Sequence, residues 1–448
     1  MVQKSLTRRH FVHSCARIGA VAPTILALNS SSAQDGEKPA LLGGEKAVRD
    51  SAPEWPQIQE PDEEKFMETF RSRGWCRLGN KVVDEFEEKW STSLKVNHAV
   101  ATVNGTSSLY AALFALGVGP GDEVIVPSYT FVASVNAILQ QFALPVFADT
   151  DRKTFQLDTT TLEERITEHT RCIMPVHLGG SMANMDEVLN IAKKHNIPVV
   201  EDACQSHFAE WRGKRAGGLG DIGCFSFQET KILPCGEGGA CVTSNEQLYD
   251  TIHAFHNNGR DRKLGTPKEG YLHQGANLRM TEYQAALLLA QLTRLDEQCQ
   301  LREKNARYLN ELLTDIPGIA PTEMYEGNTR NTYYLYMLRY DQDEFDGLPR
   351  DRFVEAVQKE GVSIGGGYRD LNKHPFLKKM LHSRWYSNIY SPARIEAYWK
   401  NNHCPENDKL GNEGLFMSQR HLLGDRSHIE QVANAFRKVR NHAKQIKG

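Results

Sequence analysis

Short apolar runs alternate with helical patterns from residue 96 to about residue 250. The runs are three to five residues long, as buried strands are, and several segments between them repeat apolar residues at helical spacings of three and four. Strands that alternate with helices favour a mostly parallel sheet with helices on both faces. The seven predicted strands are Ala99–Val103, Glu123–Val126, Pro145–Ala148, Cys172–Val176, Pro198–Val200, Gly223–Phe227 and Ala240–Thr243.

The pattern changes after the last of these strands. Thr281 and Gln284 have the spacing of a capping box, which predicts the start of a long helix. Its leucines continue to Leu313, and a Pro-Gly pair follows. We expect this helix to lead from a large domain, residues 76–295, into a smaller C-terminal α+β domain, residues 296–448. Residues 34–75 are expected to form an N-terminal arm, and 385–407 an insertion over the substrate mouth.

The first 33 residues differ from the rest of the chain. They carry four basic residues and no acidic one, and they contain the twin-arginine pattern Thr7-Arg8-Arg9-His10-Phe11-Val12. A weakly apolar run and Ser31-Ser32-Ala33, small residues of the kind that a signal peptidase cleaves, follow. We expect export by the twin-arginine pathway to the periplasm, or a cytoplasmic protein if the leader is not used. The alternative is a disordered basic tail, and in either case the run is too short for stable membrane insertion.

Charge and cysteine content exclude two classes of function. The net charge of the chain is −3, and removal of the leader leaves 49 basic and 56 acidic residues, or −7. A mildly acidic body gives no electrostatic basis for nucleic-acid binding. Of the nine cysteines, one lies in the leader and the others are scattered without the spacing of a metal site. Buried free thiols, and no bound metal, are therefore expected.

The chemistry is concentrated between residues 198 and 239. Asp202 follows Val199 and Val200, so it should lie at the carboxyl end of a buried strand, where open α/β sheets bind their ligands. Lys231 follows the next strand, just before a Gly-Glu-Gly-Gly turn. A lysine and a carboxylate so placed suit an aldehyde cofactor with a protonatable ring nitrogen. The lysine would form the Schiff base, and the aspartate would hold the ring proton.

The same stretch resembles a known family. Its matching motifs are Glu201-Asp202-Ala203, Gln205, Gly220-Asp221, Ser226-Phe227, Lys231 and Gly236-Glu237-Gly238-Gly239. They are similar to the core of the DegT/DnrJ/EryC1/StrS aminotransferases, which use pyridoxal 5'-phosphate to aminate keto-sugars and related cyclic ketones. The resemblance implies the α/β fold of the fold type I transferases, with a seven-stranded, mainly parallel sheet in the large domain. An ordinary buried strand with a surface lysine is the alternative.

A phosphate site is indicated at Asn104-Gly105-Thr106-Ser107-Ser108. Free amides, hydroxyls and the positive end of a helix dipole would bind an anion there. The residues alone are equally consistent with a capped helix start in which Thr106 is the N-cap. The resemblance implies that Gly105, Thr106 and Ser226 hold the cofactor phosphate.

The resemblance also assigns further residues of the site. Lys231 would be the catalytic residue and cofactor anchor, Phe131 would stack on the pyridine ring, and Gln205 would face the phenolic oxygen. Asn277 would reach the phosphate of the neighbouring subunit, which implies a homodimer with shared active sites. Two histidines are candidates for substrate contact: His177, at a strand end, and His374, in a loop that resembles the family's substrate loop.

These observations predict an aminotransferase that moves an amino group from glutamate or glutamine to a keto-sugar or an inosose-like cyclic ketone. The opening segment, Leu41 to Val48, resembles the branch that contains aminohydroxybenzoate synthases and scyllo-inosose aminotransferases. One alternative is a dehydratase or lyase with the same cofactor, although relatives that eliminate water replace the lysine by histidine. Another is an exported binding or regulatory protein that keeps the fold without catalysis.

Overall fold

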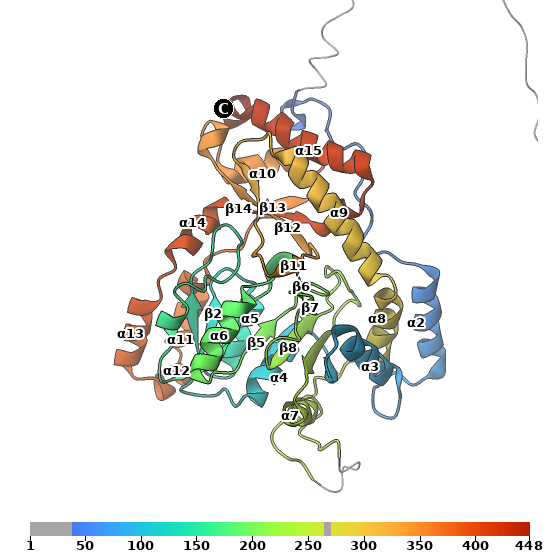
Figure 1. Ribbon diagram of the computed structural model, residues 1–448, viewed down its shortest axis with the longest axis vertical. Helices are drawn as coiled ribbons and strands as arrows, with labels where there is room; N and C mark the ends of the chain where they lie inside the picture. Colours follow the sequence, from blue (N-terminus) through green and yellow to red (C-terminus); the bar gives the residue numbers. More distant parts are fainter. Residues whose placement is uncertain (1–37, 264–269) are drawn as a thin grey trace, which may run out of the picture.

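A seven-stranded sheet lies at the centre of the larger domain in the computed structural model, which describes residues 38–263 and 270–448 (Figure 1). Two groups, β1-β9-β8-β5 and β4-β2-β3, are joined by parallel bridges from Ile173 to Val199 and from Val176 to Asp202. Only β9 runs antiparallel to its neighbours in this sheet. The strands are β1 (His98–Thr102), β2 (Glu123–Pro127), β3 (Leu144–Ala148), β4 (Thr170–Ile173), β5 (Val200–Asp202), β8 (Ile222–Ser226) and β9 (Gly239–Thr243). The predicted seven-stranded, mainly parallel sheet is confirmed.

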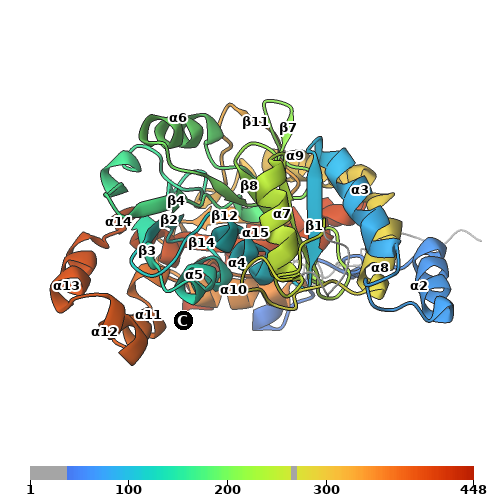
Figure 2. The same ribbon diagram turned by 90° about the horizontal axis from the view of Figure 1, so that it is seen from below.

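Helices cover both faces of this sheet, so its strands are buried on both sides. Figure 2 shows β2 and β4 between α6 on one side and α5 on the other. Successive strand residues alternate between two separate cores: Ile125 packs in one, and Val124 and Val126 pack in the other. The first core is covered by α3 (Val82–Leu94), α6 (Met185–His195) and α8 (Glu282–Leu292), the second by α4 (Gly105–Ala115), α5 (Val132–Gln140) and α7 (Glu246–His256).

The smaller domain is an antiparallel sheet with its own core. The predicted capping box at Thr281 and Gln284 starts α8, but the helix ends at Leu292, and α9 (Leu295–Leu313) leads into the smaller domain. The strands pair in the order β10 (Ile319–Pro321), β12 (Leu335–Tyr340), β14 (Gly414–Ser418) and β13 (Ile364–Gly366). Helices α10 (Arg350–Lys359), α15 (Arg426–Asn441) and α16 (Ala443–Lys447) complete this α+β unit. A small sheet of β6 (Glu210–Trp211), β7 (Lys214–Arg215) and β11 (Asn328–Arg330) joins segments of both halves.

The segment from residue 38 onwards links the two domains. The buried Glu360 carboxylate accepts hydrogen bonds from the amides of Ala40 (2.6 Å) and Ala47 (2.7 Å) in the smaller domain. The chain then reaches the larger domain, where α2 (Glu60–Ser72) lies beside α8 (Figure 1). The twin-arginine leader lies outside the described residues. None of the helices in the described residues combines the length and the hydrophobicity that a membrane span requires.

The expected insertion over the substrate mouth is wrong. The segment after residue 374 folds into α11 (Pro375–Leu381), α12 (Arg384–Ile389), α13 (Pro392–Asn401) and α14 (Pro405–Glu413). Three buried tyrosine hydroxyls donate to carbonyls beside the edge strand β3: Tyr386 to Ala143 (2.9 Å), Tyr390 to Phe142 (2.7 Å) and Tyr398 to Pro145 (2.9 Å). The helices therefore cover a sheet edge that would otherwise expose unpaired backbone groups.

Candidate active site

A cavity of about 590 Å³ opens where β5 and β8 end and α4 begins. Seven residues predicted as ligands of the cofactor line it together, although they come from four separate segments of the chain: Gly105, Thr106, Phe131, Asp202, Gln205, Ser226 and Lys231. Other lining residues that matter below are Ser134, Cys204, Thr230, Glu237, Tyr334 and Tyr368. The carboxyl edge of the sheet is therefore the place where the candidate chemistry converges.

The start of α4 forms one end of the cavity. Asn104 is the N-cap: its Oδ1 accepts a hydrogen bond from the Ser107 amide at 2.8 Å, so the prediction that Thr106 could be the N-cap is wrong. Gly105 is required for close packing, because a Cβ atom there would lie 2.6 Å from the Ser226 Cβ and 3.0 Å from the Cys204 Sγ. The first turn thus presents backbone amides beside a serine hydroxyl, which suits an anion such as a phosphate.

Asp202 is held rigidly at the end of β5. Its Oδ2 accepts from the Ser134 hydroxyl at 2.7 Å, and its Oδ1 accepts from the Cys204 amide at 3.2 Å. Only 4% of the residue is exposed. The sequence did not identify Ser134, which lies one helical turn beyond Phe131 on α5 and reaches Asp202 only because α5 packs on the sheet. A fixed carboxylate in this position can hold a proton on a ring nitrogen.

Lys231 lies in a tight turn after β8. Its amide donates to the Gln228 carbonyl at 2.8 Å, and its own carbonyl accepts from the Trp55 indole N–H at 3.2 Å. The Lys231 Nζ lies 4.1 Å from the centre of the Tyr334 ring, and the Tyr334 hydroxyl is 3.0 Å from the Thr230 Oγ1. Two aromatic residues from distant segments therefore fix the lysine's backbone and amine, and neither was predicted.

The aromatic and amide residues of the cavity are also oriented. Phe131 is 54% exposed, so one face of its ring is free instead of packed in a core. The Gln205 Oε1 accepts from the Gly179 amide at 2.9 Å, and its Nε2 donates to the Tyr368 hydroxyl at 3.0 Å. Tyr368 comes from the smaller domain, where it begins the loop that contains His374; it was not among the predicted site residues. A flat ligand could therefore stack on Phe131 while Gln205 contacts its edge.

His177 does not contact the cavity, contrary to expectation. It is fully buried, with its Nε2 2.9 Å from the Glu201 Oε2, and its Nδ1 accepts from the Ala183 amide at 3.2 Å. Both ring nitrogens are therefore engaged beneath the site. Glu201 also accepts from the amides of Gly217 (2.8 Å) and Gly220 (2.6 Å), so the pair holds the glycine-rich loop before β8.

The other two predicted residues also lie outside this cavity. His374 is the N-cap of α11: its Nδ1 accepts from the Phe376 amide at 3.4 Å, and the two rings are 5.1 Å apart. It does not line the cavity of its own chain, and its contact with substrate stays a prediction. Asn277 is exposed, with its backbone bridged to Asn257. It contributes nothing to the cavity of its own chain.

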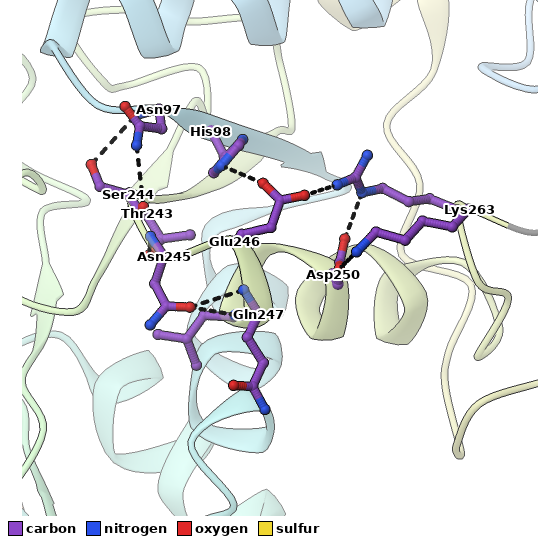
Figure 3. Close-up of polar contacts among 11 residues, drawn as sticks. Asn97, His98, Thr243, Ser244, Asn245, Glu246, Gln247, Asp250 and Lys263 are labelled. Carbon is purple, nitrogen blue, oxygen red and sulfur yellow. Dashed lines mark hydrogen bonds and ion pairs between the residues drawn. The ribbon is translucent and has the colours of Figure 1, made fainter.

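The segment that leads to Asn277 is anchored by a cluster of charges on α7 (Figure 3). The His98 Nε2 is 3.0 Å from the Glu246 Oε2, and Glu246 also pairs with Arg262. Asp250 accepts from the Arg262 Nε at 2.6 Å and pairs with Lys263. These exposed pairs fix where the segment leaves α7, although each contributes little stability alone.

The His177–Glu201 pair supports a stability prediction. Glu201→Gln should lower the free energy of unfolding by about 2–3 kcal/mol at pH 7, because its NH₂ group would replace a buried carboxylate oxygen that now accepts hydrogen bonds from N–H groups. Burial alone would raise the pKa of Glu201, but His177 and the glycine amides outweigh it and hold the pKa below its ordinary value of 4.5. The stabilisation is therefore complete above about pH 4.5 and is lost as the pH falls through the folded-state value.

Urea unfolding of both proteins at pH 7 and at decreasing pH below 4.5 measures this effect. The difference between wild type and variant should shrink at the lower pH. Equal stabilities at pH 7 would contradict a structural role for the pair.

Comparisons with known proteins agree with this geometry. The sequence profile of the DegT/DnrJ/EryC1/StrS aminotransferase family matches residues 56–385. An L-glutamine:2-deoxy-scyllo-inosose aminotransferase of Streptoalloteichus tenebrarius is 34% identical over 408 residues, which cover 87% of this chain and 94% of that protein. The crystal structure of a 3-amino-5-hydroxybenzoic acid synthase is similar with a TM-score of 0.77 and 32% identity, covering 87% and 98% of the two chains. An aminotransferase from Psychrobacter cryohalolentis has the same TM-score at 27% identity, with coverage of 88% and 99%.

Proposed function

Since this chain belongs to the DegT/DnrJ/EryC1/StrS aminotransferase family, we propose that it transfers an amino group from glutamine or glutamate to an inosose-like cyclic polyol ketone. The chain is an aminotransferase with the fold of the type I enzymes, and its family depends on pyridoxal phosphate. The relative named above supports both the donor and the class of acceptor. The observation that carries the proposal is that Lys231, Asp202 and the start of α4 line one cavity.

The residues of the cavity fit pyridoxal phosphate. The amides of the first turn of α4, with Thr106 and Ser226, would hold its phosphate, and Gly105 allows Ser226 to lie close to this turn. Phe131 would cover one face of its ring, Gln205 would contact its phenolic oxygen, and Asp202 would hold its ring nitrogen protonated. When bound, the cofactor supplies an electron sink next to the carbon that carries the amine.

The chain's own groups then provide proton transfer and orientation. The Lys231 amine would anchor the cofactor and, once displaced by the substrate's amine, move a proton to or from the carbon that bears nitrogen. Tyr334 and Trp55 would keep that amine at the cavity wall. Retention of a lysine at this position favours transfer of the amine over the elimination of water, the main alternative for this fold.

Two half-reactions test the proposal. Enzyme loaded with pyridoxal phosphate and mixed with L-glutamine alone should lose its visible absorbance, and scyllo-inosose added afterwards should restore it. Formation of the aminated cyclitol should match the amount of enzyme in a single turnover. Release of water from the ketone without a donor would instead support the lyase, and absence of both reactions with bound cofactor would support a non-catalytic protein.

A homodimer with shared active sites is the second part of the proposal. Trp75 and Phe70 stack with ring centres 5.9 Å apart, and Trp75 lies 5.7 Å from Tyr283. Phe70 and Trp75 are about half exposed. This aromatic face lies next to the chain leading from Asn277, because Cys76 bridges to Thr281. A second copy would cover the face and bring its Asn277 to the phosphate site, so the purified protein should have the mass of two chains in solution.

Export is the third part. The twin-arginine pattern supports transport of a protein that folds around its cofactor first. The eight cysteines of the described residues are all free, and most are buried, as expected if folding is complete before the protein reaches an oxidising compartment. Cell fractionation tests this: recovery of the full-length protein in the cytoplasm alone would contradict export.

A further inference from the structure

A second cleft of about 640 Å³ adjoins the cavity described above. The two share Thr230 and Tyr334, whose hydrogen-bonded side chains form part of the boundary between them. The rest of the cleft comes from the smaller domain, where β12, β13 and β14 face the larger domain (Figure 1). Its polar residues are Gln358, Ser363, Ser418 and Gln419. The cleft therefore adjoins the cavity that contains Lys231 at Thr230 and Tyr334.

A buried arginine lies directly behind this cleft. The Arg302 Nε donates to the Gln419 Oε1 at 2.7 Å, and the guanidinium lies 5.1 Å from the centre of the Trp55 ring. The residue is fully buried, and both of its terminal nitrogens lack a hydrogen-bond partner among the described residues. Burial lowers the pKa of Arg302 to about 10, so the group is still charged at neutral pH. Within the same residues no acidic side chain pairs with it, which leaves an uncompensated buried cation.

Arg302 determines the orientation of the Gln419 side-chain amide. Because the amide oxygen of Gln419 accepts from Arg302, its NH₂ group remains to donate, and no hydrogen bond from it occurs among the described residues. Hydrogen bonds in a chain polarise one another, so the guanidinium strengthens this donor. Lys231 is the only basic residue among those that line the cavity or the cleft, and the reacting amine requires it.

We propose that Gln419, positioned by Arg302, binds the carboxylate of the amino donor. The inference rests on the proposed function, because the amino donor carries a carboxylate that needs a subsite. The uncharged ketone has no such group. The donor's amine would lie at Lys231 and its carboxylate at Gln419. Trp55 contacts the supporting groups of both positions: its indole N–H donates to the Lys231 carbonyl, and its ring centre lies 5.1 Å from the Arg302 guanidinium. The donor's carboxylate would then interact with the positive charge of Arg302 through the Gln419 amide. No acidic side chain of the described residues does so.

Gln419→Glu tests the subsite without loss of the fold. The new carboxylate would accept from Arg302 and neutralise it, so the variant should be at least as stable as wild type while it repels an anionic donor. We expect the KM for L-glutamine in the first half-reaction to rise about 30-fold or more, with a much smaller change in kcat. The second half-reaction, from pyridoxamine phosphate and scyllo-inosose, should change by no more than about threefold. Gln419→Met, of similar size and uncharged, should give an intermediate rise in KM.

A binding measurement separates this inference from the proposed function. Glutarate carries carboxylates but no amine, so it can occupy the subsite without reacting. It should raise the melting temperature of wild-type protein loaded with pyridoxal phosphate and have no effect on Gln419→Glu. An unchanged donor KM, or equal losses in both half-reactions, would overturn the inference even if transamination is found. If glutarate also raises the melting temperature of Gln419→Glu, the inference is overturned even if no transamination is found.

Discussion

Lys231→Ala should abolish transamination, with kcat/KM for the amino donor lowered by a factor on the order of 10⁴ or more. The substitution removes the amine that anchors the cofactor and also the base that moves the proton. No other lysine lines the cavity among the described residues, so none can replace it. The protein should also lose the visible absorbance that the wild type acquires with pyridoxal phosphate.

The fold should survive this substitution. Lys231 makes one cation–π contact, with Tyr334, and its backbone hydrogen bonds do not depend on the side chain. Loss of a contact of this kind costs about 1 kcal/mol, which should shift the melting temperature only slightly. Lys214→Ala removes an exposed lysine from the short strand β7 and serves as the control, with full activity expected. A Lys231→Ala protein that still transaminates would exclude the assigned role.

The sequence was sufficient for the parts of the fold that follow a local pattern. Apolar runs marked the seven strands, and glycines and charges marked their ends, so the edge of the sheet that holds Asp202 and Lys231 could be predicted. The covering of the β3 edge could not, because the carbonyls that the three tyrosines bond, in and just before β3, lie more than 240 residues away in the sequence. The break between α8 and α9 was also missed, since the leucine pattern continues across it.

The error at His177 has a simple geometric cause. Successive residues of a strand point to opposite faces, so a strand end alone does not say which side chain enters the site. Asp202 faces the cavity, whereas its neighbour Glu201 points the other way and meets His177 in the interior. A one-residue difference in position along the strand therefore separates a predicted ligand of the cofactor from a buried carboxylate that bonds a histidine.

The residues that orient the chemistry were missed for a related reason. Trp55, Ser134, Tyr334 and Tyr368 contact their partners from segments 68 to 176 residues away. None of them belongs to a motif with fixed spacing. Their positions depend on packing between the two domains and the N-terminal arm. Local sequence patterns do not predict this packing. The sequence therefore indicated which groups react, and the structure was needed to show what holds them.

Asp202→Asn should lower kcat by a factor on the order of 10³ and weaken cofactor binding, although it changes the shape of the side chain very little. The asparagine oxygen could accept from the Cys204 amide in place of Oδ1, and its NH₂ group could donate to the Ser134 hydroxyl oxygen in place of Oδ2. It carries no negative charge, however, and so cannot keep a ring nitrogen protonated. The effect should therefore appear in kcat and in the absorbance spectrum of the loaded enzyme, with the melting temperature of the protein without cofactor almost unchanged.

Asp221→Asn provides the matched control. Asp221 lies in the same family motif, but its Oδ2 accepts from the Val199 amide at 2.8 Å and it does not line the cavity. If Asp202 acts through its charge at the sheet edge, Asp202→Asn should lose activity and Asp221→Asn should keep near-normal activity. If both variants were equally active, Asp202 would be a structural cap of β5. If both were equally impaired, the motif would act through folding, and the assignment of Asp202 to the cofactor ring would be wrong.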